Sequence, residues 1–112
     1  MDRSAPEPRR ELTGKQRRWL RGRANPLSAL VHVGQSGLSE AVVAATRAAL
    51  EAHELVKVRL HEPDDKKATA RQLAEASGAA LCGVVGHTVI LYLRNDEAPR
   101  LAVPGLEPGA PD

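Results

Sequence analysis

The chain has 112 residues and a formal net charge of +2, which is enough sequence for one domain and too little for two. It contains no phenylalanine, one tryptophan and one tyrosine, so we expect a core of small aliphatic side chains. Cys82 is the only cysteine, which excludes an internal disulfide and a metal site built from cysteines. No apolar run approaches the about 18 residues of a membrane span, and no secretion signal is recognisable. We therefore expect a cytoplasmic protein with no membrane partner.

Positive charge is concentrated near the beginning of the chain. Seven of the sixteen lysine and arginine residues lie between Arg9 and Arg23, where Glu11 is the only acid. A cluster of this kind indicates either a surface that binds a polyanion or a solvated helix face.

The two ends lack the periodic apolar pattern of the middle. Residues 1–11 carry two prolines and several charges, and we predict a disordered basic arm. Residues 12–95 form the predicted folded domain. Residues 96–112 are rich in proline and glycine, and we predict a tail that is largely disordered, above all beyond Pro104.

A helix is predicted at the start of the domain. Thr13 and Gln16 have the spacing of a capping box, and the helical pattern ends near residues 22–24. Trp19 and Leu20 are the main apolar anchors of this helix. Three of its basic side chains are spaced so that two or three guanidinium groups can share one face, and these are Arg17, Arg18 and Arg21.

The most informative stretch is a pair of glycines between a predicted strand and a predicted helix. The strand covers residues 27–33, the loop is Gly34-Gln35-Ser36-Gly37, and Ser39 is a suitable N-cap for a helix that ends at His53. Glycine permits positive φ and close backbone approach, and a helix N-terminus offers unpaired N–H groups. The GxxG loop is therefore a candidate phosphate cradle, although most glycine pairs of this spacing are simple turns.

The second predicted strand, residues 54–61, alternates between apolar and basic side chains. Lys57, Arg59 and His61 share its polar face. This face either extends an anion-binding surface across the sheet or is an ordinary solvated face.

The remaining pattern completes an α-β-α-β-α-β-β order. A third helix is predicted at residues 66–77, followed by strands at 80–85 and 88–94 that a Gly86-His87 turn of type II′ connects. Each βαβ unit implies parallel strands, and the last pair is antiparallel. The prediction is a compact α/β domain with a mixed four-stranded sheet.

No catalytic set of residues accompanies these elements. Asp64 and Asp65 precede the third helix, where capping is far more frequent than a metal pair, and no third ligand follows at suitable spacing. His32 and Glu40 are the ionisable groups nearest to the GxxG loop, and neither a nucleophile nor a Walker lysine stands beside them. We therefore predict that the protein is not an enzyme and uses no cofactor or metal.

Several motifs follow one another in register, namely Ala24-Asn25-Pro26-Leu27, Val31-x-Val33-Gly34-Gln35-Ser36-Gly37-Leu38-Ser39-Glu40, Glu54-Leu55-Val56-Lys57-Val58 and Gly86-His87-Thr88-Val89-Ile90-Leu91-Tyr92. Together they resemble the CRM (chloroplast RNA splicing and ribosome maturation) domain in its stand-alone bacterial YhbY form, over about residues 12–104. The resemblance implies an RNA-binding module with a fold similar to the C-terminal domain of translation initiation factor three. It also implies a GxxG loop like that of KH domains and a link to precursors of the large ribosomal subunit.

These observations predict a non-catalytic, monomeric RNA-binding protein that contacts ribosomal RNA of large-subunit precursors through the GxxG loop and an adjacent basic helix. The scarcity of aromatic residues argues against the stacking platforms of RRM and OB modules. The residues predicted to bind RNA are Lys15, Arg17, Arg18, Arg21, Gly34, Gln35, Ser36, Gly37, Lys57 and Arg59. Relatives often have a basic residue inside the loop, whereas the residues here are neutral, so we expect the arginines to supply most of the attraction. The alternatives are a protein–protein adaptor that docks through its first helix, and an enzyme that binds a small phosphate compound.

Overall fold

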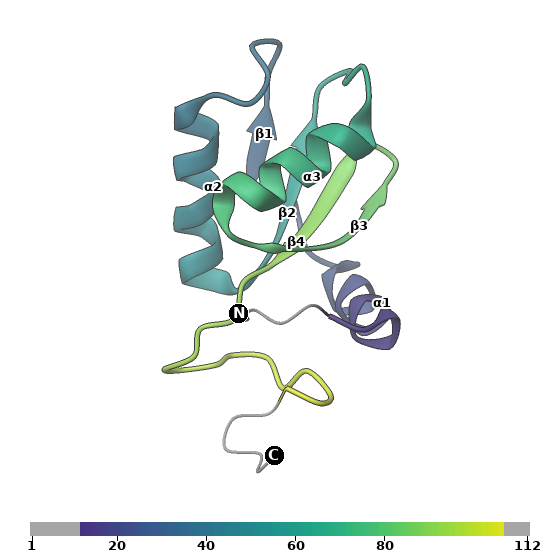
Figure 1. The fold of residues 1–112 in the computed structure, drawn as a ribbon, viewed down its shortest axis with the longest axis vertical. Helices are drawn as coiled ribbons and strands as arrows, with labels where there is room; N and C mark the ends of the chain where they lie inside the picture. Colours follow the sequence, from purple (N-terminus) through teal and green to yellow (C-terminus); the bar gives the residue numbers. More distant parts are fainter. Residues whose placement is uncertain (1–11, 107–112) are drawn as a thin grey trace, which may run out of the picture.

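The computed structural model describes residues 12–106, which form three helices around a four-stranded sheet (Figure 1). The elements in chain order are α1 (Gly14–Ala24), β1 (Val31–Val33), α2 (Glu40–His53), β2 (Leu55–Leu60), α3 (Lys66–Ser77), β3 (Ala80–Val85) and β4 (Thr88–Tyr92). The predicted element order and the mixed α/β class are confirmed. The basic arm predicted for residues 1–11 and the end of the predicted tail, residues 107–112, lie outside the described residues.

The sheet has the strand order β1-β2-β4-β3. Strand β1 is parallel to β2, whereas β4 is antiparallel to both of its neighbours, β2 and β3. Strands β2 and β3 consequently run in the same direction, as the βαβ pattern predicts, but β4 lies between them. None of the helices within residues 12–106 is long and apolar enough to cross a membrane.

The helix ends follow the predicted capping chemistry. The Thr13 hydroxyl accepts from the Gln16 amide at 3.0 Å, and the Gln16 side chain accepts from the Thr13 amide at 2.9 Å. Ser39 caps α2, and the Asp65 carboxylate caps α3 by accepting from Ala68 N. Gly78 ends α3 with a left-handed φ of 77°. The interpretation of Asp65 as a cap is therefore confirmed.

The first strand is shorter than predicted, because only Val31–Val33 pairs with β2. Residues 27–30 form a connection from α1 to the edge of the sheet, and Leu27 and Leu30 are exposed. The Lys57 ammonium donates to the Leu27 carbonyl at 2.9 Å and holds this connection against β2. The apolar pattern suggested a strand here, but the chain has to leave helix α1 before it reaches the sheet.

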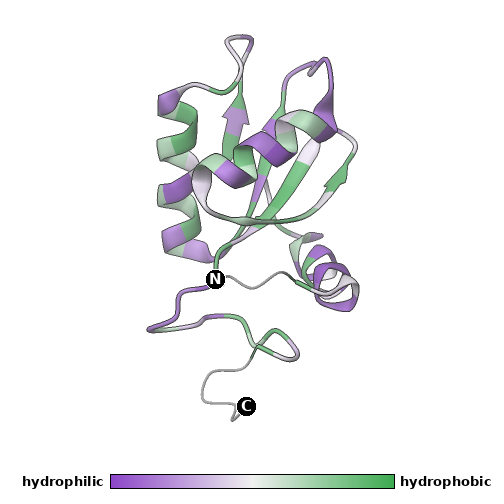
Figure 2. Cartoon of the chain, viewed as in Figure 1, coloured by the Kyte–Doolittle hydropathy of each residue, from purple (hydrophilic) through white to green (hydrophobic). Residues whose placement is uncertain are grey.

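The two faces of the sheet pack against different partners. On one face, which we call the closed face, side chains such as Val56, Val58 and Leu91 pack beneath α2 and α3. On the opposite face, which we call the second face, Leu55, Ile90 and other residues pack against α1 and the C-terminal segment, residues 95–106. Figure 2 shows hydrophobic colour along β4, at the centre of both clusters, and hydrophilic colour over most of α1.

The C-terminal segment packs against the folded domain beyond the boundary predicted at residue 95. Val103 is fully buried in the cluster on the second face, and Leu101 and Leu106 pack against that cluster. The segment is held by Glu54, whose buried carboxylate accepts from three backbone amides of residues 95–101 at 2.7 to 3.0 Å. Proline and glycine content suggested disorder here, but a buried acceptor and an apolar anchor fix the segment.

Candidate nucleic-acid interface

The GxxG loop is an exposed turn at the end of β1. The Gly37 amide donates to the Gly34 carbonyl at 3.0 Å, and Gln35 and Ser36 are exposed between them. Within residues 12–106, the backbone amides of Gln35 and Ser36 donate no hydrogen bond. Two adjacent backbone N–H groups are thus available to an anion from solution.

The two glycines of the loop serve different purposes. Gly37 has a φ of 77°, a backbone conformation that side chains rarely adopt, so the turn itself requires a glycine there. Gly34 has no positive φ, and a Cβ atom placed on it would meet nothing within 4 Å. The fold does not require Gly34. Its lack of a side chain is consistent with close approach by a bound molecule.

The GxxG loop is not adjacent to the basic helix, and the predicted arrangement is wrong in this respect. Figure 1 shows the loop beyond the end of β1 at the top of the view and α1 at the lower right. Helix α1 packs against β2, β3 and β4. The second face of the sheet lies between the two predicted binding elements.

Part of that second face is left uncovered by α1. The strand register aligns His32 on β1, Arg59 on β2, Thr88 on β4 and Val85 on β3 in one row across the sheet. His32 and Arg59 are exposed, Thr88 is half-buried, and Val85 is 60% exposed. We call this row the open row. It contains no acid, and within residues 12–106 the Arg59 guanidinium has no hydrogen-bond or ion-pair partner. The sequence predicted RNA binding for Arg59 and gave His32 only as an ionisable group near the loop, because the strand order is needed to place the four residues in one row.

Three of the predicted RNA-binding cations are engaged with backbone carbonyls. Arg17 donates to Leu12 O at 2.6 Å and Arg21 to Cys82 O at 2.7 Å. Lys57 donates to two carbonyls of the chain that leaves α1. These side chains hold α1 and its connection in place, so only part of their hydrogen-bonding capacity is left for RNA.

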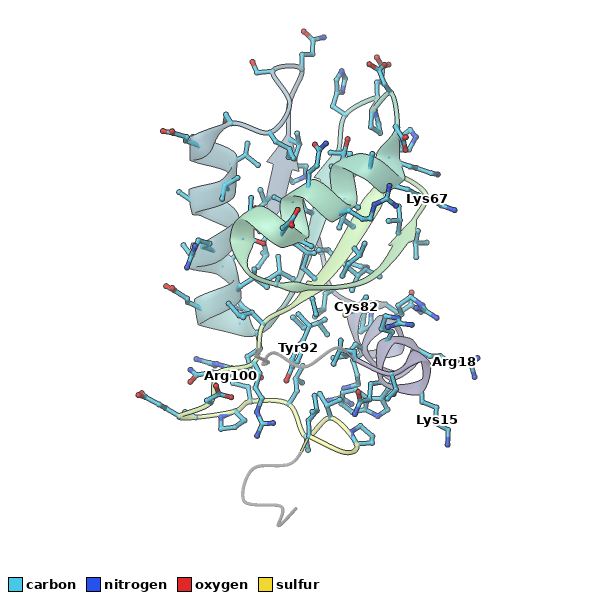
Figure 3. All side chains as sticks on the ribbon, in the orientation of Figure 1. Lys15, Arg18, Lys67, Cys82, Tyr92 and Arg100 are labelled. Carbon is cyan, nitrogen blue, oxygen red and sulfur yellow. The ribbon has the colours of Figure 1, made fainter. Side chains whose placement is uncertain are left out.

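The remaining basic residues of α1 point away from the sheet. Lys15 and Arg18 are exposed, and Figure 3 shows both side chains extending outward from the helix. Arg23 lies over the Trp19 ring, with its guanidinium carbon 5.3 Å from the ring centroid. The arginines at positions 17, 18 and 21 therefore do not all share one face, as one interpretation of their spacing suggested.

The ionisable groups of the described chain do not form a reactive centre. Cys82 is buried, and this burial raises the pKa of its thiol to about 12, so the thiolate needed for nucleophilic attack is disfavoured. Within residues 12–106, no three histidine, cysteine or carboxylate side chains are close enough to hold a metal ion. His53, at the end of α2, is exposed.

Comparison with known proteins places this geometry in a family. Residues 12–93 match the model of the CRS1/YhbY (CRM) domain. The probable RNA-binding protein YqeI of Bacillus subtilis is 35% identical over 95 residues, which cover 83% of this chain and 99% of YqeI. An RNA-binding protein of Haemophilus influenzae is 35% identical over 89 residues, covering 78% of this chain and 90% of the relative.

The fold agrees with the same relationship. The solution structure of the hypothetical protein SAV1595 from Staphylococcus aureus superposes with a TM-score of 0.71 at 32% identity, over 82% of this chain and 96% of SAV1595. The family match covers residues 12–93, and this range contains every helix and strand described above. The chain belongs to the CRS1/YhbY (CRM) domain family.

Proposed function

We propose that this protein binds RNA without catalysing a reaction, and that its target is ribosomal RNA in precursors of the large ribosomal subunit. The observation that carries the proposal is the exposed GxxG loop, where Gly34 is not required by the fold and two amides have no partner within residues 12–106. Relatives of this chain are named RNA-binding proteins, which supports RNA as the polyanion. We further propose that it acts in the cytoplasm as a monomer.

The interface we propose extends from the GxxG loop across the open row to α1. A phosphate oxygen at the loop accepts from the amides of Gln35 and Ser36. Arg59 neutralises a neighbouring phosphate, and Lys15 and Arg18 extend the positive potential at the far end. Most contacts of this kind go to the sugar–phosphate backbone, which explains how a protein with so few aromatic residues recognises RNA.

A binding experiment with paired variants tests the loop. The double variant Gln35→Asp/Ser36→Asp places two negative charges at the proposed phosphate site, and we expect it to lose binding to large-subunit ribosomal RNA transcripts while keeping its thermal stability. The control variant Gln72→Asp/Ala76→Asp adds the same charge at exposed positions of α3, on the opposite side of the sheet. Equal RNA affinity of the two variants would show that the loop is only a turn.

The salt dependence of binding tests the electrostatic mechanism. If about five phosphates are neutralised, a plot of log affinity against log salt concentration has a slope of roughly −3.5 to −4.5. A flat plot contradicts the mechanism.

Nuclease treatment separates RNA binding from the adaptor alternative. When the tagged protein is recovered from cell extract, an RNA binder loses its co-purifying ribosomal proteins after RNase digestion, whereas an adaptor that docks through α1 retains its partners. Sedimentation of the extract on a gradient then tests the target, because we expect the protein among large-subunit precursors rather than among free small subunits.

A further inference from the structure

A cleft lies between the first turns of α1 and the C-terminal segment. It has a volume of about 450 Å³, and its lining residues are Thr13, Lys15, Gln16, Arg18, Trp19 and Pro104. We call it the Trp19 cleft. It brings an indole ring and a proline ring together with two exposed cationic side chains, and its volume is within the about 300–1,000 Å³ of small-ligand sites. The GxxG loop lies elsewhere in the molecule, so the proposed loop contact does not use this cleft.

The walls of the Trp19 cleft are fixed by the fold. The Gln16 side-chain amide donates to the Pro104 carbonyl at 2.8 Å, which joins the C-terminal segment to α1. Val103, the residue before Pro104, is fully buried. The Trp19 ring is partly buried against the cluster on the second face, so its orientation is restrained as well. A ligand that enters this cleft meets a surface that is already ordered, which lowers the entropic cost of binding.

The Trp19 side chain contacts Arg23 and also lines the cleft. Arg23 lies one helical turn after Trp19, and its guanidinium covers the ring from that direction. The cleft residues Lys15 and Gln16 lie one turn before Trp19. Trp19 therefore contacts Arg23 one turn later in α1 and lines the cleft together with residues one turn earlier.

We propose that the Trp19 cleft binds one unpaired RNA base, which stacks against the indole and Pro104 while Lys15 and Arg18 neutralise the adjoining phosphates. The inference rests on the proposed RNA-binding function and adds a contact that recognises a base. Aromatic side chains stack on bases of any sequence, and the flanking phosphates require nearby cations. The charge of the site agrees with this ligand, because α1 carries five basic side chains and no acid.

The protein is therefore expected to prefer RNA that has an unpaired nucleotide near the phosphates contacted by the open row. A base inside a duplex is already stacked on its neighbours and cannot enter the cleft without unpairing. One aromatic ring provides one stacking position, in contrast to the platforms of RRM modules.

Fluorescence offers a direct test, because Trp19 is the only tryptophan of the chain. The intact protein is titrated with a single-stranded oligoadenylate RNA and with the duplex that this RNA forms with oligouridylate. Anisotropy of a dye on the RNA measures occupancy, and Trp19 emission is read at equal occupancy. We expect clear quenching by the single strand and little by the duplex. Equal quenching by both, or none with either, overturns the inference.

Two variants test the Trp19 cleft by RNA affinity, independently of Trp19 fluorescence. Pro104→Ala removes one wall of the cleft, and Trp19→Leu removes the stacking surface while retaining an apolar anchor. We expect each to bind the single strand about fivefold more weakly or worse, the lower end of what one stacked base contributes. The control Leu30→Ala truncates an exposed side chain outside the cleft and leaves affinity unchanged.

The outcomes separate the two proposals. If Trp19→Leu proves unstable in thermal unfolding, Pro104→Ala alone decides, since it retains the indole. If the unaltered protein binds none of the RNAs, both proposals fail. If it binds RNA through the GxxG loop while both cleft variants bind like the control, only the Trp19 cleft inference fails.

Discussion

The two faces of the sheet are covered to different extents. Beneath α2 and α3, the closed face is lined by aliphatic side chains, and its helices follow an apolar pattern of period 3.6. The second face is covered at one end by α1 and the C-terminal segment, and at the other end the open row is exposed. Its cover depends on a few directed hydrogen bonds. Arg21 and Lys57 donate to backbone carbonyls, and the Glu54 carboxylate accepts from backbone amides.

The difference explains where recognition is located. A face that is fully packed against two helices has no surface left for a ligand, whereas a partly covered face presents ordered strands with exposed polar side chains. The hydrogen bond from the Gln16 side chain to the Pro104 carbonyl belongs to the same cover and joins the two walls of the Trp19 cleft. Stability and binding are therefore linked on the second face, and changes there separate the two contributions.

The largest expected effect of a single substitution is the loss of stability in Glu54→Gln. Glu54 is fully buried, and its carboxylate accepts from the amides of Asn95, Arg100 and Leu101. The variant removes the charge from these bonds and sets an NH₂ group against one buried N–H, so we expect the free energy of unfolding to fall by about 3 kcal/mol. Urea unfolding measures this. The control Glu51→Gln, at an exposed position of α2, is expected to stay within about 0.5 kcal/mol of the unaltered protein.

The next effect is a loss of stability at alkaline pH that arises from the covered part of the second face. Burial raises the pKa of Cys82 from 9.0 to about 12, and burial together with the Glu54 charge raises that of Tyr92 from 10.0 to about 12. The folded state holds both protons more tightly than the unfolded state does. Their contribution to stability is complete below pH 9 and is lost as the pH rises toward 12, by up to about 1.4 kcal/mol per pH unit for each group.

Urea unfolding at stepwise pH values measures this slope. In Tyr92→Phe the slope that Tyr92 contributes above pH 10 is absent, and the Cys82 contribution remains. A stability that does not change across this range would contradict the burial of both groups.

The sequence predicts the helices that cover the closed face better than it predicts the cover of the second face. The helices over the closed face and their caps follow from local patterns, and Ser39 and Asp65 act as expected. The cover of the second face depends on contacts between residues far apart in the chain, such as Glu54 with Leu101. Proline content in the C-terminal segment indicated disorder, because local composition carries no information about a buried acceptor elsewhere.

The candidate site shows the same division. The GxxG turn and the exposed position of Arg59 were recognisable from glycine spacing and strand alternation. The engagement of Arg17 and Arg21 with backbone carbonyls was not, because it depends on how α1 lies against the sheet. Charge counting therefore overestimated the number of free cations on α1.

A smaller effect is expected where α1 approaches β3. A Cβ atom on Gly83 would lie 2.6 Å from Cδ of Arg21, whose guanidinium donates to Cys82 O. We expect Gly83→Ala to displace this side chain and to lower the free energy of unfolding by about 1 kcal/mol through the lost hydrogen bond. On α1 itself, a Cβ atom on Gly22 would meet no atom within 4 Å, and we expect Gly22→Ala to stabilise the protein by about 0.5–1 kcal/mol. Similar stabilities for the two variants would show that Arg21 does not hold α1 against β3.

The smallest effect is a change in RNA binding that distinguishes the two faces without a change in stability. Arg59 is exposed in the open row, and Arg71 is exposed on α3 over the closed face, so charge reversal at either position leaves the core intact. We expect Arg59→Glu to weaken RNA binding about fivefold and to reduce the magnitude of the salt slope by about 1, since one phosphate contact is lost. Arg71→Glu changes the net charge by the same amount and is expected to leave the salt slope unchanged. Because the two variants are matched in charge, equal losses of affinity would mean that RNA responds to the overall charge of the protein and not to the open row.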